Sequence, residues 1–160
     1  MKKITVLGVG NILLKDEGFG VRVVEQLQER FDFPEQVQVL DGGTLGMELM
    51  RFLLETDKLI LIDAVSGSLT PGSLYELRGQ AVKTYFKEKI SLHDIGIQEV
   101  LAALEVLEKP VKEIVVLGVE PAVVDVGLEL SPVVAPIVES VIKKVIAELN
   151  AWQVEVSSNV

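Results

Sequence analysis

Four short apolar runs, rich in β-branched residues, set the strongest limit on how this 160-residue chain can fold. Each run is only four to six residues long and is bounded by glycine or by polar residues, which favours a strand over a buried helix. Such runs, interrupted here only by Thr5 and Gln38, are typical of parallel strands that are covered on both faces of a sheet. They lie at residues 4–8, 37–40, 59–62 and 114–119.

Segments with helical spacing separate these strands. Residues 18–31 place Val21, Val24, Leu27 and Phe31 on one face, and residues 47–54 and the stretch from Ile97 to Leu104 also look helical. The pair Ser131-Pro132 is typical of an N-cap and a first helical turn, so a final helix is expected to begin there. The segment 80–89 fits neither pattern clearly.

Strands that alternate with helices predict an α/β fold, here a three-layer αβα sandwich with a five-stranded, mostly parallel sheet. A fifth strand at residues 73–77 follows too short a link for a helical crossover, so we expect it to pair antiparallel and to make the sheet mixed. No repeat or linker interrupts the chain. We therefore expect one domain over residues 1–152 and a flexible polar tail over residues 153–160.

Composition excludes several functional classes. No apolar run approaches the roughly 18 residues that a membrane helix requires, and the apolar stretch at the N-terminus is too short for a signal peptide. The chain has no cysteine, and its net charge of −9 disfavours nucleic acid or an anionic membrane surface as a partner. These features together predict a cytoplasmic protein that is not inserted into a membrane.

Three residues of types that commonly bind metals are expected at the ends of predicted strands or beside the starts of predicted helices. They are Glu17, Asp63 and His93, the last being the only histidine of the chain. The carboxyl ends of parallel strands meet at one edge of a sheet, so these side chains are expected to converge. Two carboxylates and one imidazole suit a divalent metal with coordination positions left open for a substrate. Taken singly, each residue is as easily explained as a helix-capping charge or a turn residue.

Two other functions compete with a metal site. Gly8 and Gly10 after the first strand suggest dinucleotide binding, but Leu13 stands where the third glycine or alanine belongs. Asp63 at the end of a central strand also suits a phosphoacceptor receiver domain, although the last strand is followed by Glu120-Pro121 rather than by lysine. Asp41-Gly42-Gly43-Thr44 is either a loop that grips an extended peptide or a plain turn between a strand and a helix.

Five motifs in order give the chain a resemblance to the hydrogenase maturation endopeptidases, over about residues 3 to 150. The resembling segments are GVGNILLKDEGFGVRVVEQL, LDGGTLGMEL, LILIDAV, SLHDIGIQEVL and LGVEP. In this family the three metal-contacting positions correspond to Glu17, Asp63 and His93. The resemblance implies an enzyme that removes a short C-terminal extension from the large-subunit precursor of a [NiFe] hydrogenase after nickel insertion.

The resemblance also implies how the residues are used. The nickel belongs to the precursor and is recognised through Glu17, Asp63 and His93, a donor set that zinc or cadmium would also occupy. Independently of the resemblance, our hypothesis is that Asp41 serves as the general base and that Gly42, Gly43 and Thr44 hold the peptide. Family analogy and size favour a monomer.

Overall fold

The computed structural model describes residues 3–43, 46–88 and 95–159. Its main sheet has five strands in the order β3-β1-β4-β6-β5, of which the first four run parallel and β5 runs antiparallel to β6. The strands are β1 (Ile4–Val9), β3 (Val37–Gly43), β4 (Lys58–Ala64), β5 (Leu74–Arg78) and β6 (Glu113–Val119). This arrangement confirms the predicted mixed α/β sheet and the antiparallel fifth strand.

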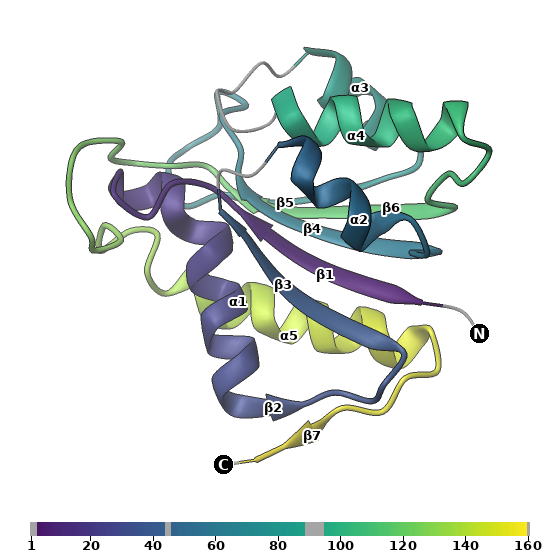
Figure 1. Ribbon diagram of the computed structural model, residues 1–160. Coiled ribbons are helices and arrows are strands. Elements are labelled where there is room, and N and C mark those ends of the chain that lie inside the picture. The colour runs from purple at the N-terminus through teal and green to yellow at the C-terminus, as the bar shows by residue number, and fades with distance from the viewer. Residues whose placement is uncertain (1–2, 44–45, 89–94, 160) are drawn as a thin grey trace.

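Helices cover both faces of this sheet (Figure 1). One face carries α1 (Phe19–Arg30) and α5 (Ile137–Ala151), and the other carries α2 (Met50–Leu53), α3 (Gln80–Glu88) and α4 (Ile95–Val106). Two short 3-10 turns, η1 (Lys15–Gly18) and η2 (Met47–Leu49), lead into α1 and α2. The segment 80–89, which the sequence left open, is therefore helical at least through Glu88.

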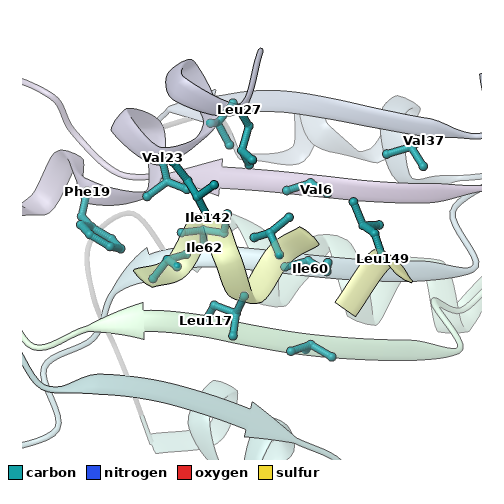
Figure 2. Packing of buried hydrophobic residues seen from close by; sticks show 14 of the residues in the cluster. Val6, Phe19, Val23, Leu27, Val37, Ile60, Ile62, Leu117, Ile142 and Leu149 are labelled. Atoms are coloured by element: carbon teal, nitrogen blue, oxygen red, sulfur yellow. The ribbon is translucent and has the colours of Figure 1, made fainter. Parts of the chain in front are cut away.

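The larger of two apolar clusters is buried between the sheet and the helices α1 and α5 (Figure 2). Val6, Ile60 and Leu117 project from neighbouring strands, and α1 and α5 close over them with Leu27 and Ile142. In the four parallel strands, the apolar residues that join this cluster are spaced two apart, because strand side chains alternate between the two faces. The intervening residues, such as Leu7 and Leu61, form the second cluster under α3 and α4.

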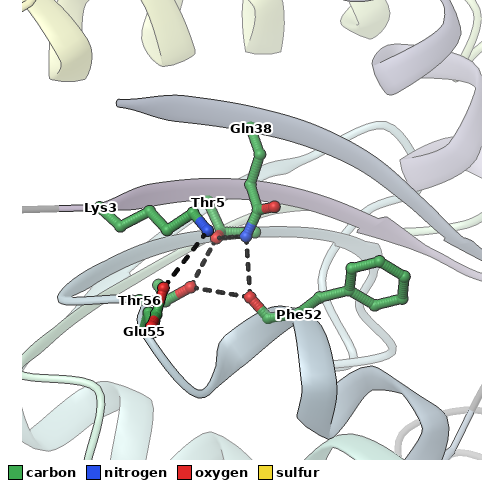
Figure 3. Close-up of polar contacts among 6 residues, drawn as sticks. All are labelled: Lys3, Thr5, Gln38, Phe52, Glu55 and Thr56. Carbon is green, nitrogen blue, oxygen red and sulfur yellow. Dashed lines mark hydrogen bonds and ion pairs between the residues drawn. The ribbon is translucent and has the colours of Figure 1, made fainter. Parts of the chain in front are cut away.

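A small polar cluster joins α2 to the sheet on that second face (Figure 3). The Gln38 amide donates to the Thr5 hydroxyl at 2.7 Å and to the Phe52 carbonyl at 2.8 Å, and the Thr5 and Thr56 hydroxyls lie 2.7 Å apart. Buried polar groups must be paired, so these bonds fix α2 in one position. The connection between β3 and β4 is thereby tied down over β1.

The chain order reverses direction between two neighbouring strands of the sheet. From β1 the chain continues to β3 on one side, and from β4 it continues through β5 to β6 on the other. The connections therefore diverge between β1 and β4, and α/β folds bind their ligands at such a point.

Two details differ from the sequence-based expectations. The final helix begins at Ile137 rather than next to Ser131, and residues 132–136 form turns. The C-terminal segment was expected to be flexible, yet Val154 is buried in the core, and β7 (Ser157–Ser158) pairs with β2 (Phe31–Asp32). Burial of the apolar Val154 just after α5 holds the tail close to the carboxyl end of α1, where β2 begins. In the described part of the chain, no helix has the length and apolar character needed to cross a membrane.

Candidate functional site

Asp63 lies at the end of the central strand β4 and is fully buried. Its Oδ1 accepts a hydrogen bond of 2.8 Å from the backbone N–H of Ala64, and its Oδ2 accepts one of 3.0 Å from the Tyr85 hydroxyl. These bonds hold the carboxylate in one orientation, as hydrogen bonds to metal-binding side chains commonly do. Tyr85 comes from α3, and no sequence pattern marked it.

Glu17 is half-buried and lies in η1, which contacts β4. Two glycines bring this turn and the start of α1 against the strand ends. A Cβ on Gly20 would lie 2.1 Å from the carbonyl oxygen of Ile62, and one on Gly10 would lie 1.9 Å from that of Glu17 itself. Glu17 and Asp63 are therefore at the same edge of the sheet, as the sequence predicted for strand-end ligands.

The third predicted ligand, His93, lies outside the described residues. Within residues 3–43, 46–88 and 95–159, no three acidic, histidine or cysteine side chains gather closely enough to hold a metal. Of the three predicted ligands, the structure therefore describes only the two carboxylates, Glu17 and Asp63, and the complete set of metal ligands stays a prediction.

Asp41 is exposed near the end of β3 and is turned away from Asp63. It follows Val37 and Val39 at intervals of two, and these side chains pack on the α1 side, whereas Asp63 follows Leu59 and Leu61 on the α3 and α4 side. The two carboxylates thus lie on opposite faces of the sheet. This geometry gives no support for a direct joint action of Asp41 and Asp63.

The glycines after Asp41 form a distinct end to β3. Gly42 is buried, and a Cβ there would approach the Leu7 side chain to 2.8 Å. Gly43 has a φ of 47°, and its carbonyl accepts a 2.8 Å hydrogen bond from the Gly10 N–H. Thr44 lies outside the described residues. Because β3 is an edge strand of the sheet, its outer side can pair with an extended peptide.

Asp16 is a buried carboxylate whose role the sequence did not reveal. It accepts hydrogen bonds from the N–H groups of Ala122, Val123 and Ser131 and from the Ser131 hydroxyl, all at 2.8–2.9 Å. Burial alone would raise the pKa of Asp16, but these bonds to the ionised form outweigh burial and hold its pKa below the ordinary value. Asp16 thereby fastens the loop after β6 to the turn that carries Glu17.

Glu120 is a second buried carboxylate at this edge. It accepts hydrogen bonds from the N–H groups of Gly67 and Leu69 and from the Tyr75 hydroxyl, the last at 2.6 Å. Burial, reinforced by the bond to Glu120, raises the pKa of Tyr75 to about 12. Glu120 thus holds the loop that follows β4 in place.

A cavity of about 620 Å³ opens at the opposite end of β6, between α3 and α4. Its lining includes Arg78, Val82, Phe86, Leu101 and Glu113. Among the predicted site residues that the structure describes, Glu17, Asp41, Gly42, Gly43 and Asp63, none lines this cavity.

Comparisons with known proteins agree with the predicted family. The family model of hydrogenase maturation proteases matches residues 21–148. The chain is 42% identical over 154 residues to the hydrogenase 2 maturation protease of Escherichia coli strain K12, which covers 96% of this chain and 94% of that protein. It is 39% identical over 158 residues to the hydrogenase expression/formation protein HupD of Rhodobacter capsulatus, covering 98% and 75%.

Solved structures give the same result. The hydrogenase maturating endopeptidase HybD from E. coli superposes with a TM-score of 0.93 at 40% identity, covering 98% of both chains. The [NiFe] hydrogenase maturation protease HybD from Thermococcus kodakarensis superposes with a TM-score of 0.76 at 30% identity, covering 93% of this chain and 99% of that one. These matches favour the peptidase interpretation over the dinucleotide-binding and receiver alternatives. The chain therefore belongs to the hydrogenase maturation proteases and is an endopeptidase.

Proposed function

We propose that this endopeptidase removes the C-terminal extension of a nickel-loaded [NiFe] hydrogenase large-subunit precursor. The observation that carries the proposal is Asp63, a buried and doubly hydrogen-bonded carboxylate at the carboxyl edge of the sheet. The hydrogen bonds fix the direction of the carboxylate before any ligand arrives, so little conformational entropy is lost when a metal binds. Glu17 stands at the same edge in η1.

The nickel is part of the substrate in this proposal. Glu17, Asp63 and His93 contact it and so distinguish a loaded precursor from an empty one. Oxygen and nitrogen donors suit nickel. Because this chain has no cysteine, it offers no thiolate that would compete for the metal of the precursor. Bound in this way, nickel would polarise the scissile carbonyl or lower the pKa of a water molecule. Zinc or cadmium would occupy the same donors in the absence of substrate.

The extended peptide is proposed to lie along the end of β3. An edge strand offers unpaired N–H and C=O groups with which a peptide can pair, and Gly42 and Gly43 form the end of this strand. Thr44 completes this proposed segment. The role of Asp41 as general base stays a prediction, and cleavage by Asp41→Asn at the wild-type rate would remove it from the mechanism.

Ligand substitutions test the metal contact directly. Asp63→Asn and His93→Ala should each lower the rate of precursor cleavage by about 100-fold or more, because loss of a metal ligand removes recognition. The matched control is Asp57→Asn just before the amino end of the same strand, where the carboxylate lies 3.7 Å from Lys112. Rapid cleavage by Asp63→Asn would overturn the proposal. We also propose that the protein is cytoplasmic and monomeric.

A further inference from the structure

Exposed apolar side chains are concentrated in two loops beside the candidate site. Of ten large apolar side chains exposed among the described residues, six lie within residues 11–18 and 120–136. Val126 is 82% exposed and Leu128 is 60% exposed. We call five of them the apolar rim: Leu13, Val123, Val124, Val126 and Leu128. Clusters of exposed apolar side chains mark surfaces that bind another molecule.

The backbone beneath the apolar rim is fixed. The Gly127 N–H donates to the Leu13 carbonyl at 2.9 Å, and the Lys15 N–H donates to the Gly127 carbonyl at 3.0 Å. The Arg22 guanidinium donates to the Leu128 carbonyl at 2.9 Å, and the buried Asp16 carboxylate holds both loops together. The exposed side chains are therefore presented by a pre-ordered surface, which lowers the entropy lost on binding.

The apolar rim borders the predicted nickel contacts. Leu13 and Glu17 belong to the same loop, and the segment from 120 to 131 follows β6, whose Gly118 pairs with Asp63. Figure 1 shows the chain after β6 passing beside the purple turn that precedes α1. A partner that brings a metal to Glu17 and Asp63 must set its own surface against these loops.

The charged residues around the apolar rim limit the kind of partner surface that it can bind. The whole chain carries a net charge of −9, and in residues 11–18 and 120–131 the one cation is Lys15. The anions there are Asp16, Glu17, Glu120, Asp125 and Glu129, of which Asp16 and Glu120 are buried. The Asp125 carboxylate is partly satisfied by the Val126 N–H at 3.1 Å. The five side chains of the apolar rim are uncharged, and the charges that flank them are mostly acidic, so the rim fits an apolar area of a partner better than an acidic one.

We propose that the apolar rim is the docking surface for an apolar area on the folded body of the large-subunit precursor, next to its nickel. This inference rests on the proposed function and adds to it a second contact, separate from the cleaved peptide and from the metal ligands. A folded substrate needs such a contact because its metal is surrounded by its own surface. The double variant Val126→Ser with Leu128→Ser removes apolar area without touching the hydrogen bonds of the loop backbone.

The test compares this variant with a matched pair. Val106 at the end of α4 is 82% exposed and Leu107 is 53% exposed, so Val106→Ser with Leu107→Ser removes similar area elsewhere. With nickel-loaded precursor, the rim variant should raise KM by about tenfold and leave kcat unchanged, because a few central apolar contacts dominate such interfaces. The control pair should stay within about twofold of wild type. Melting temperatures are measured for all three proteins.

The outcomes separate the two proposals. If the wild-type protein cleaves the precursor and the rim variant has the KM of the control, the docking surface is wrong and the proposed function stands. If the wild-type protein neither binds nor cleaves the precursor, both are wrong. Sedimentation analysis adds a third outcome, since a wild-type dimer that the rim variant dissociates, with KM unchanged, would assign the surface to a second copy of this chain.

Discussion

Tyr85 has a role that only the folded chain reveals. Its hydroxyl donates to Asp63 Oδ2 at 3.0 Å, and its ring is buried in the cluster under α3 and α4. Tyr85→Phe keeps the ring and removes the hydroxyl, so we expect kcat/KM for precursor cleavage to fall by about tenfold, as for other groups that orient metal ligands. Tyr75→Phe, which removes a hydroxyl bound to Glu120 instead, is the control. Equal activity of both variants would mean that Tyr85 does not position Asp63.

Tyr75 should report its own environment in a pH titration. Its pKa of about 12 lies above the ordinary tyrosine value near 10, because burial and Glu120 both oppose the phenolate. The neutral phenol thus stabilises the fold fully below pH 10, and this contribution is lost between about pH 10 and pH 12. The difference in phenolate absorbance between wild type and Tyr75→Phe should have its midpoint near pH 12. A midpoint near pH 10 would contradict both the burial of the Tyr75 hydroxyl and its contact with Glu120.

The packing of α1 on the strand ends depends on the absence of a side chain at position 20. A Cβ there would meet the carbonyl oxygens of Ile62 at 2.1 Å and Val9 at 2.6 Å, and these backbone atoms cannot move aside easily. Gly20→Ala should therefore cost about 1–3 kcal/mol and lower Tm by about 2–12 °C. Gly127→Ala is the control, because its Cβ would meet only the flexible Lys15 side chain. Similar melting temperatures for wild type and Gly20→Ala would contradict this close packing.

The elements could be predicted from the sequence to the extent that their signals are local. Continuous apolar runs revealed the parallel strands, and the short link before β5 revealed its antiparallel pairing. The start of α5 was mispredicted for a non-local reason. Ser131 looked like an N-cap, but its N–H and its hydroxyl both donate to Asp16, 115 residues earlier in the chain. The hydroxyl is therefore committed elsewhere, and the helix begins only at Ile137.

The candidate site could be predicted only in part, because some of its contacts are non-local. Strand ends converge in an α/β fold, so Asp63 and the turn with Glu17 could be located from sequence. The partners that orient or fasten these residues come from distant segments, as with Tyr85 on α3 and the loop after β6 on Asp16. Asp41 and Asp63 lie on opposite faces of the sheet. This could not be predicted from the sequence, because it depends on which helices cover which face in the folded chain.

The stability of the whole molecule should depend on pH through Asp16. Its folded pKa lies below the unfolded value, so its contribution is present above about pH 4 and is lost as the pH falls through the folded pKa. At pH 7, Asp16→Asn should lower the free energy of unfolding by about 2–4 kcal/mol, because the amide cannot accept all of the hydrogen bonds. The difference from wild type should shrink near pH 3. Urea unfolding of both proteins at the two pH values measures it.

A nearby carboxylate provides the control for that experiment. Asp125 lies in the same loop but accepts only the Val126 N–H, at 3.1 Å and at an exposed position. Asp125→Asn should leave the free energy of unfolding within about 0.5 kcal/mol of wild type at both pH values. An Asp16→Asn protein as stable as wild type at pH 7 would show that the two loops are held by other contacts.

The most direct test of the proposed function is the intact mass of a large-subunit precursor after incubation with this protein. Precursor loaded with nickel and precursor without nickel are compared, each with wild type and with Asp63→Asn. The account predicts loss of one C-terminal peptide only when nickel and wild-type protein are both present. Equal cleavage of nickel-free precursor, or cleavage by Asp63→Asn, would contradict recognition of the metal through the carboxylate at the end of β4.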